Sequence, residues 1–141
     1  MNGTCYQVIQ QINKCLHYHY WKKGTIIKLI AEGKTVSVID LTEGELGTRG
    51  TAETRAEEAA EAAKILGISS RENLKLKDGF LNNSEDYQLK IVEKIRKYKP
   101  EIVLANAIDD RHPDHAKAAK LVSDACFLSG LIKIETELNG I

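Results

Sequence analysis

The spacing of hydrophobic and polar residues changes repeatedly along the chain from residue 24 onward. Apolar positions three and four residues apart indicate helices over 26–33, 52–67, 84–99 and 114–129. Continuous apolar runs indicate strands over 35–41 and 101–107, with a short strand inside 72–79. Helices that alternate with strands in this way predict a layered α/β fold with a mostly parallel sheet.

Two distinctive loops, 42–51 and 107–115, each follow a predicted strand. The carboxyl ends of parallel strands meet at one edge of a sheet, and ligands bind there. The second loop contains the sequence HPDH at 112–115, preceded by Asp109 and Asp110. We therefore expect a functional site at this edge.

The N-terminal segment, 1–23, differs from the rest of the chain. It contains no acidic residue, yet it holds two of the three cysteines and three of the five tyrosines. Val8, Ile9, Ile12 and Leu16 could form one side of a helix, and no strand is evident. We therefore separate this divergent segment from a domain over 24–141.

Composition narrows the class of protein. Twenty basic and twenty acidic residues give a formal net charge of zero, which argues against nucleic acid or an anionic membrane as a partner. The sequence has no apolar run long enough to cross a bilayer, and its cysteines form no CxxC pair. These features predict one cytoplasmic domain with reduced thiols.

The HPDH sequence combines groups that suit metal chemistry. A neutral imidazole is a common zinc ligand, and a nearby carboxylate can fix its tautomer. The plainer alternative is that Asp114 caps a helix beside two solvated histidines. Arg55 likewise has a plain interpretation, a surface pair with Glu58 on the same helix.

Together, HPDH and the stretch DLTEGELGTRGTAETRAEEAAEAA at 40–63 resemble the LmbE/PIG-L family of zinc-dependent de-N-acetylases, and most of all its bacillithiol-biosynthesis branch. The resemblance extends from about Gly24 to Asn139. It implies a Rossmann-like three-layer sandwich, here a partial domain over 24–141. It also implies hydrolysis of the N-acetyl group of an N-acetylglucosaminyl conjugate, N-acetylglucosaminyl malate in that branch.

Site roles follow from the resemblance residue by residue. It makes His115 a zinc ligand, His112 the group that stabilises the oxyanion, and Asp114 the residue that orients His112. Arg55 matches a position that binds the substrate or the acetate product. The implied cofactor is Zn²⁺, the implied partner is a small sugar conjugate, and the chain is a possible homo-oligomer.

The chain departs from the family at its N-terminal end. The family's AHPDD motif, which supplies two metal ligands and the general base, is missing, and the resemblance then implies an incomplete sheet without its first strand. We therefore expect weak or no activity, or a module that only binds a glycan or a partner chain. A replacement metal site from His17, His19, His115 and Asp110 is the less favoured alternative.

Overall fold

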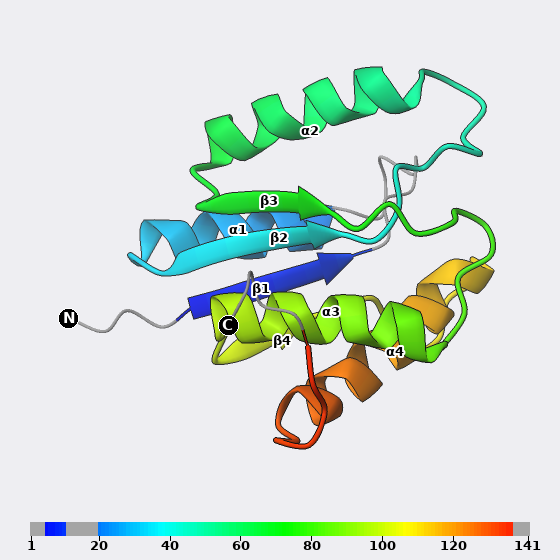
Figure 1. Ribbon diagram of the computed structural model, residues 1–141. Coiled ribbons are helices and arrows are strands. Elements are labelled where there is room, and N and C mark those ends of the chain that lie inside the picture. The colour runs from blue at the N-terminus through cyan, green and yellow to red at the C-terminus, as the bar shows by residue number, and fades with distance from the viewer. Residues whose placement is uncertain (1–4, 11–19, 137–141) are drawn as a thin grey trace.

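The computed structural model describes residues 5–10 and 20–136. Within these ranges four parallel strands form one sheet in the order β3-β2-β1-β4 (Figure 1). The strands are β1 (Cys5–Gln10), β2 (Thr35–Asp40), β3 (Ser70–Asn73) and β4 (Ile102–Leu104). The helices are α1 (Tyr20–Ala31), α2 (Ala52–Leu66), α3 (Glu85–Tyr98) and α4 (Pro113–Ser129).

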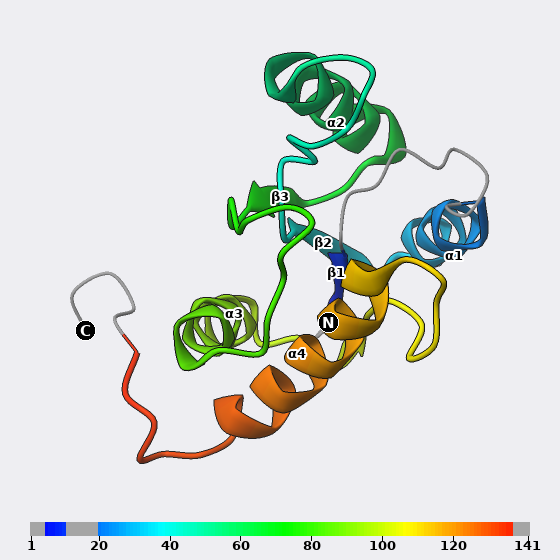
Figure 2. The same ribbon diagram turned by 90° about the vertical axis from the view of Figure 1, so that its right-hand side faces the viewer.

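Helices cover both faces of the sheet. Figure 2, which looks onto the carboxyl ends of the strands, shows α1 on one face, α3 and α4 on the other, and α2 beyond the β3 edge. Neighbouring residues of a strand point to opposite faces. Val8 and Val38 accordingly pack with α1 residues, whereas Ile9 and Ile39 pack with residues of α3 and α4. The predicted α/β fold with a parallel sheet is confirmed.

Strand β1 corrects the expectation for the N-terminal segment. It pairs with β2 along its whole length and with β4 on its other side, so it is an inner strand. The expectation of a sheet without its first strand, and of a helix through Val8 and Ile9, is wrong, whereas Ile12 and Leu16 of that expected helix lie outside the described residues. The sequence pattern was misleading for two reasons. Val8 and Ile9 are both buried because helices cover both faces of the sheet, and polar Gln7 and Gln10 interrupt the apolar run.

Gln7 is the unusual residue of β1. Its side chain is fully buried, and neither polar atom of its amide has a hydrogen-bond partner among the residues that the structure describes. In register beside it lies buried Ser37, which accepts a hydrogen bond from Ser70 Oγ at 3.1 Å. A buried amide without partners destabilises the folded state.

The predicted helices are present, and their ends follow from local chemistry. Thr51 and Thr54 form a capping box at the start of α2, which ends at Gly67 in the left-handed conformation with φ +73°. Ser84 caps α3 by accepting from Tyr87 N. These helix ends lie close to those that the sequence predicts.

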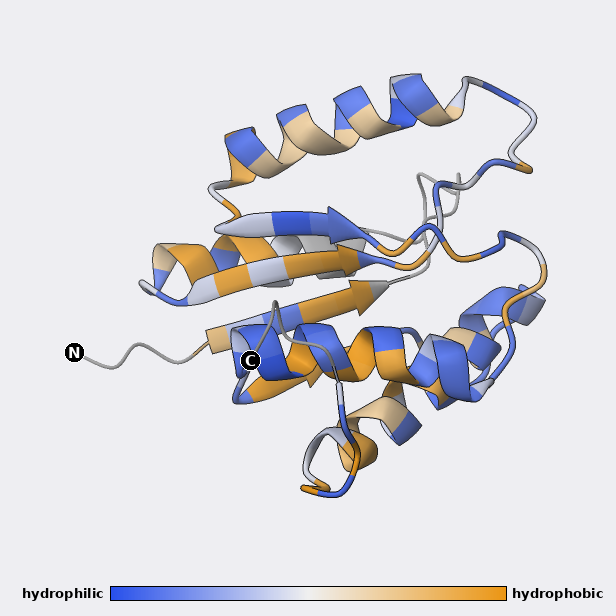
Figure 3. Cartoon of the chain, viewed as in Figure 1, coloured by the Kyte–Doolittle hydropathy of each residue, from blue (hydrophilic) through white to orange (hydrophobic). Residues whose placement is uncertain are grey.

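Strand β3 begins earlier than the predicted strand within 72–79 and is polar, as its largely blue colour in Figure 3 shows. Its Glu72 is held by α3 through Lys94 Nζ at 2.7 Å, Lys97 Nζ at 2.6 Å and the Tyr98 hydroxyl. Burial acts to raise the pKa of Glu72, but these hydrogen bonds outweigh it and lower the pKa to about 2. Pairing and side-chain anchoring, rather than an apolar pattern, define this strand.

Across the described residues, none of the helices combines the length and apolar character that crossing a bilayer requires.

Candidate active site

The candidate site lies at the carboxyl edge of the sheet, where the loops after β2, β3 and β4 meet the start of α4 (Figure 2). His112 is the N-cap of α4 and Pro113 its first residue, a position where the missing N–H of proline costs nothing. The HPDH sequence therefore marks a helix start, and both of its histidines lie at that start.

Asp110 and His115 form the central pair of the site. Asp110 Oδ2 lies 2.9 Å from His115 Nδ1, and both side chains are mostly buried. Asp110 Oδ1 accepts from His112 N at 2.8 Å. That backbone donor, together with His115, holds the pKa of Asp110 below its usual value, so the carboxylate stays ionised.

The pair fixes how His115 presents its ring. Because ionised Asp110 only accepts hydrogen bonds, Nδ1 of His115 is assigned the proton, and Nε2 carries the lone pair. A carboxylate bonded to one ring nitrogen while the other faces a metal is the usual arrangement around metal-binding histidines. The geometry of His115 thus fits a ligand.

His112 has the complementary arrangement. Its Nδ1 accepts from Asp114 N at 3.3 Å, which assigns the proton of a neutral ring to Nε2. The rings of His112 and His115 are tilted by 33° with centroids 4.8 Å apart. In their neutral forms the two neighbouring rings therefore carry opposite tautomers.

Asp114, which stands between the two histidines in the sequence, is fully buried. Its Oδ2 accepts from Gly79 N at 2.7 Å, and its Oδ1 is 3.4 Å from Leu81 N. The plain helix-capping role does not describe this carboxylate, because it binds the loop after β3 and the cap of α4 is His112.

Arg55 lies on the first turn of α2, facing the glycine-rich loop after β2. Its guanidinium donates to Gly44 O and, at 2.6 Å, to Arg49 O. A Cβ atom at Gly47 would lie 2.8 Å from Arg55 Cζ, so the loop wraps closely around the charged group. The structure thus gives Arg55 loop partners rather than the surface pair with Glu58 that the plain interpretation offers.

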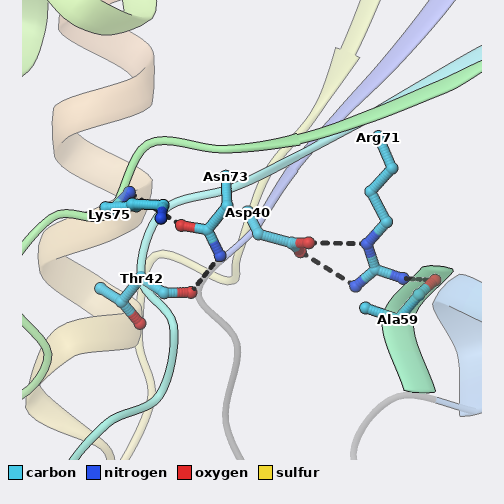
Figure 4. Close-up of polar contacts among 6 residues, drawn as sticks. All are labelled: Asp40, Thr42, Ala59, Arg71, Asn73 and Lys75. Carbon is cyan, nitrogen blue, oxygen red and sulfur yellow. Dashed lines mark hydrogen bonds and ion pairs between the residues drawn. The ribbon is translucent and has the colours of Figure 1, made fainter. Parts of the chain in front are cut away.

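A second charged pair, Asp40 and Arg71, lies at the same carboxyl edge of the sheet, where β2 ends (Figure 4). Asp40, the last residue of β2, accepts two hydrogen bonds from Arg71, with Nε at 2.6 Å and Nη2 at 3.1 Å. Arg71 Nη1 also donates to Ala59 O and so connects β3 to α2. Asn73 Nδ2 donates to Thr42 O at 2.9 Å, which fixes the start of the loop after β2.

Sequence reasoning missed the residues that join the loops. Glu45 lies in the loop after β2, whereas Asp78 and Gly79 lie in the loop after β3, and these residues make the contacts that join the two loops and α4. Asp110 was expected only as a possible metal ligand, and the structure pairs it with His115. The single sequence signal for the loop residues was an aspartate followed by glycine after a predicted strand, which indicates a turn and nothing more.

The described residues offer His115 as a candidate metal ligand and no complete metal site. His115 offers one imidazole of suitable geometry, but over 5–10 and 20–136 no three histidine, cysteine, aspartate or glutamate side chains group so that they could hold a metal ion. A catalytic zinc site uses three protein ligands. His17 and His19 lie outside the described residues, so the replacement site considered from the sequence stays an untested prediction.

Comparison with known proteins places most of the chain in the family that its sequence resembles. Residues 20–126 match the PIG-L family, described as GlcNAc-PI de-N-acetylase. The diacetylchitobiose deacetylase of Thermococcus kodakarensis is 35% identical over an alignment of 118 residues, which covers 77% of this chain and 44% of that protein.

Two solved structures share the fold closely. The conserved protein TT1542 from Thermus thermophilus has a TM-score of 0.83 and 36% identity, over 96% of this chain and 60% of that one. The N,N'-diacetylchitobiose deacetylase from Pyrococcus horikoshii has a TM-score of 0.82 and 25% identity, over 94% of this chain and 52% of that one. The chain therefore spans about half the length of these relatives.

Proposed function

This chain belongs to the PIG-L family, and we propose that the site at the start of α4 serves zinc-dependent hydrolysis of the N-acetyl group of an N-acetylglucosaminyl conjugate. The observation that carries the proposal is the Asp110–His115 pair, which orients a metal-binding nitrogen at the sheet edge. The resemblance of residues 40–63 to the bacillithiol branch supports N-acetylglucosaminyl malate as the substrate. A cytoplasmic location belongs to the same proposal.

Each residue has a defined part in this reaction. His115 would hold zinc through Nε2, where the ion would supply polarisation of the amide carbonyl and a more acidic water. His112 donates from Nε2 to the oxygen that becomes negatively charged. Asp114 positions His112 by placing its own backbone amide on His112 Nδ1. Arg55, with several N–H donors, can hold the loop and still bind a sugar oxygen or acetate.

We expect this chain alone to be weakly active or inactive, because its described residues do not complete a metal site. That observation supports a second candidate function, a module that binds the sugar conjugate without hydrolysing it. In that module the loop after β2, which Arg55 holds through Gly44 O and Arg49 O, would contact the sugar.

Zinc stoichiometry and acetate release test the two candidates together. Metal-free protein is titrated with zinc, and each sample is then assayed for acetate released from N-acetylglucosaminyl malate and from N,N'-diacetylchitobiose. The variants are His115→Ala and, as a matched control on the exposed side of α4, Lys117→Ala. The hydrolase predicts about one zinc per chain in the wild type and in Lys117→Ala, and loss of zinc in His115→Ala.

The outcomes separate the proposals. Acetate release that disappears in His115→Ala establishes the hydrolase, whichever sugar conjugate is preferred. Saturable binding of the conjugate without zinc or turnover leaves the binding module. Absence of zinc, turnover and sugar binding refutes both.

A further inference from the structure

The loops after β2 and β3 are fastened to each other by hydrogen bonds in both directions. Asp78, which is only 5% exposed, accepts from Leu46 N through Oδ2 at 3.2 Å. In return, Asp78 N donates to Glu45 Oε1 at 2.8 Å. Two bonds of opposite polarity between the same short segments fix both their separation and their register.

Gly79 extends this connection to α4. Its backbone has φ +77°, a conformation that side-chain-bearing residues rarely adopt, and a Cβ there would lie 2.7 Å from Leu46 Cδ1. Its N–H donates to Asp114 Oδ2 at 2.7 Å. One residue therefore contacts the loop after β2 on one side and the HPDH sequence on the other.

Asp114 needs this contact because its carboxylate is fully buried. Buried polar atoms need hydrogen-bond partners, and Gly79 supplies Asp114 with a short one. The turn at 78–81 is thus a structural requirement of the residue that stands between His112 and His115 in the sequence. A displaced turn would either carry Asp114 and the Leu46 loop with it or lose its hydrogen bonds to them.

We propose that Asp78 is a positioning residue that couples the loop at 44–47 to the HPDH helix start, so that the substrate-side loop and the two histidines are set together. Arg55 anchors the other side of the same loop through Gly44 O. The proposal rests on the proposed function only where it calls that loop the substrate side. The coupling itself is a property of the described contacts.

Amide exchange and histidine NMR signals of the full-length protein test the coupling without requiring activity. In Asp78→Ala, the Leu46 amide loses its acceptor, and we expect it to exchange at least about tenfold faster. Asp78→Asn keeps a side-chain oxygen and should restore most of the protection. Asp86→Ala, which removes an exposed carboxylate on α3, is the matched control and should leave Leu46 unchanged.

The coupling also predicts a change at the two histidines, which a purely local role of Asp78 does not predict. The imidazole signals of His112 and His115 should shift in Asp78→Ala and return in Asp78→Asn. If Leu46 exchanges at the wild-type rate in Asp78→Ala, or if it exchanges faster while both imidazoles stay in place, the proposal is overturned. Should Asp78→Ala fail to fold, Gly79→Ala replaces it, because it displaces the Leu46 side chain and strains the same turn.

A titration with N-acetylglucosamine separates this proposal from the proposed function. If the wild type binds the sugar, we expect roughly three- to tenfold weaker binding in Asp78→Ala and unchanged binding in Asp86→Ala. If the wild type does not bind the sugar, the proposed substrate class fails, while the amide and imidazole signals still decide the coupling.

Discussion

Replacing Gln7 with methionine should stabilise this protein, although most substitutions in a core destabilise it. Gln7 is fully buried in the inner strand β1, and the two polar atoms of its amide lack partners among the described residues. Methionine has a similar length and flexibility and carries no polar group that needs a partner. The change therefore removes the unsatisfied amide while leaving the shape of the core nearly unaltered.

The magnitude follows from two opposing terms. Removing a buried, unsatisfied polar group recovers about 1–3 kcal/mol of unfolding free energy. A hydrophobic residue of similar volume costs less than about 1.5 kcal/mol in repacking strain. We expect a net gain of about 1–2 kcal/mol, which raises the melting temperature by roughly 3–8 °C for a chain of this size.

Urea denaturation followed by circular dichroism measures the change. The matched control is Gln88→Met, because Gln88 on α3 is half-buried and its Nε2 already donates to Asn83. That variant should stay within about 0.5 kcal/mol of the wild type. A Gln7→Met protein that is no more stable than the wild type would show that the amide of Gln7 is satisfied in solution, and the argument would fail.

Two further predictions concern the loop after β2 and the edge strand. Gly47→Ala should destabilise the protein by about 1–2 kcal/mol in the same assay, because the new Cβ displaces the Arg55 guanidinium from its loop carbonyls. Gly24→Ala, where a Cβ meets nothing, should not, and equal behaviour of the two variants would contradict the prediction. Folding lowers the pKa of Glu72 from about 4.3 in the unfolded chain to about 2. The stabilisation that its carboxylate contributes is therefore complete above about pH 4.3 and disappears as the pH falls toward 2. Unfolding free energies measured from about pH 6 to pH 2 should therefore fall less steeply in Glu72→Gln, and identical slopes would count against the assigned hydrogen bonds.

Periodicity was sufficient to predict the elements whose burial is one-sided or continuous. α3 and α4 have clear apolar faces, and β2 is a run of residues buried on both sides. β1 escaped prediction because Gln7 and Gln10 interrupt its short apolar run, and only tertiary pairing makes it a central strand. β3 was misplaced because its position is likewise defined by tertiary contacts, namely the pairing with β2 and the contacts of Glu72.

Only part of the candidate site could likewise be predicted from the sequence. HPDH was recognisable because its residues are adjacent in the chain. The partners that fasten it to the neighbouring loops, Asp78 and Gly79, lie far from it in the sequence, and no local pattern distinguishes them from an ordinary turn. The roles of His112, Asp114, His115 and Arg55 remain predictions for the experiments above.

The inner position of β1 also sets the order in which the chain can fold. β1 is made before β4, its second neighbour, so Tyr6 must wait for Ile102 to complete its pairing. At ordinary rates of synthesis, about 5 to 20 seconds separate the two strands on the ribosome. During that interval one side of β1 is an open edge, able to pair with any other extended chain. The nascent chain is therefore most open to strand-to-strand aggregation before β4 emerges.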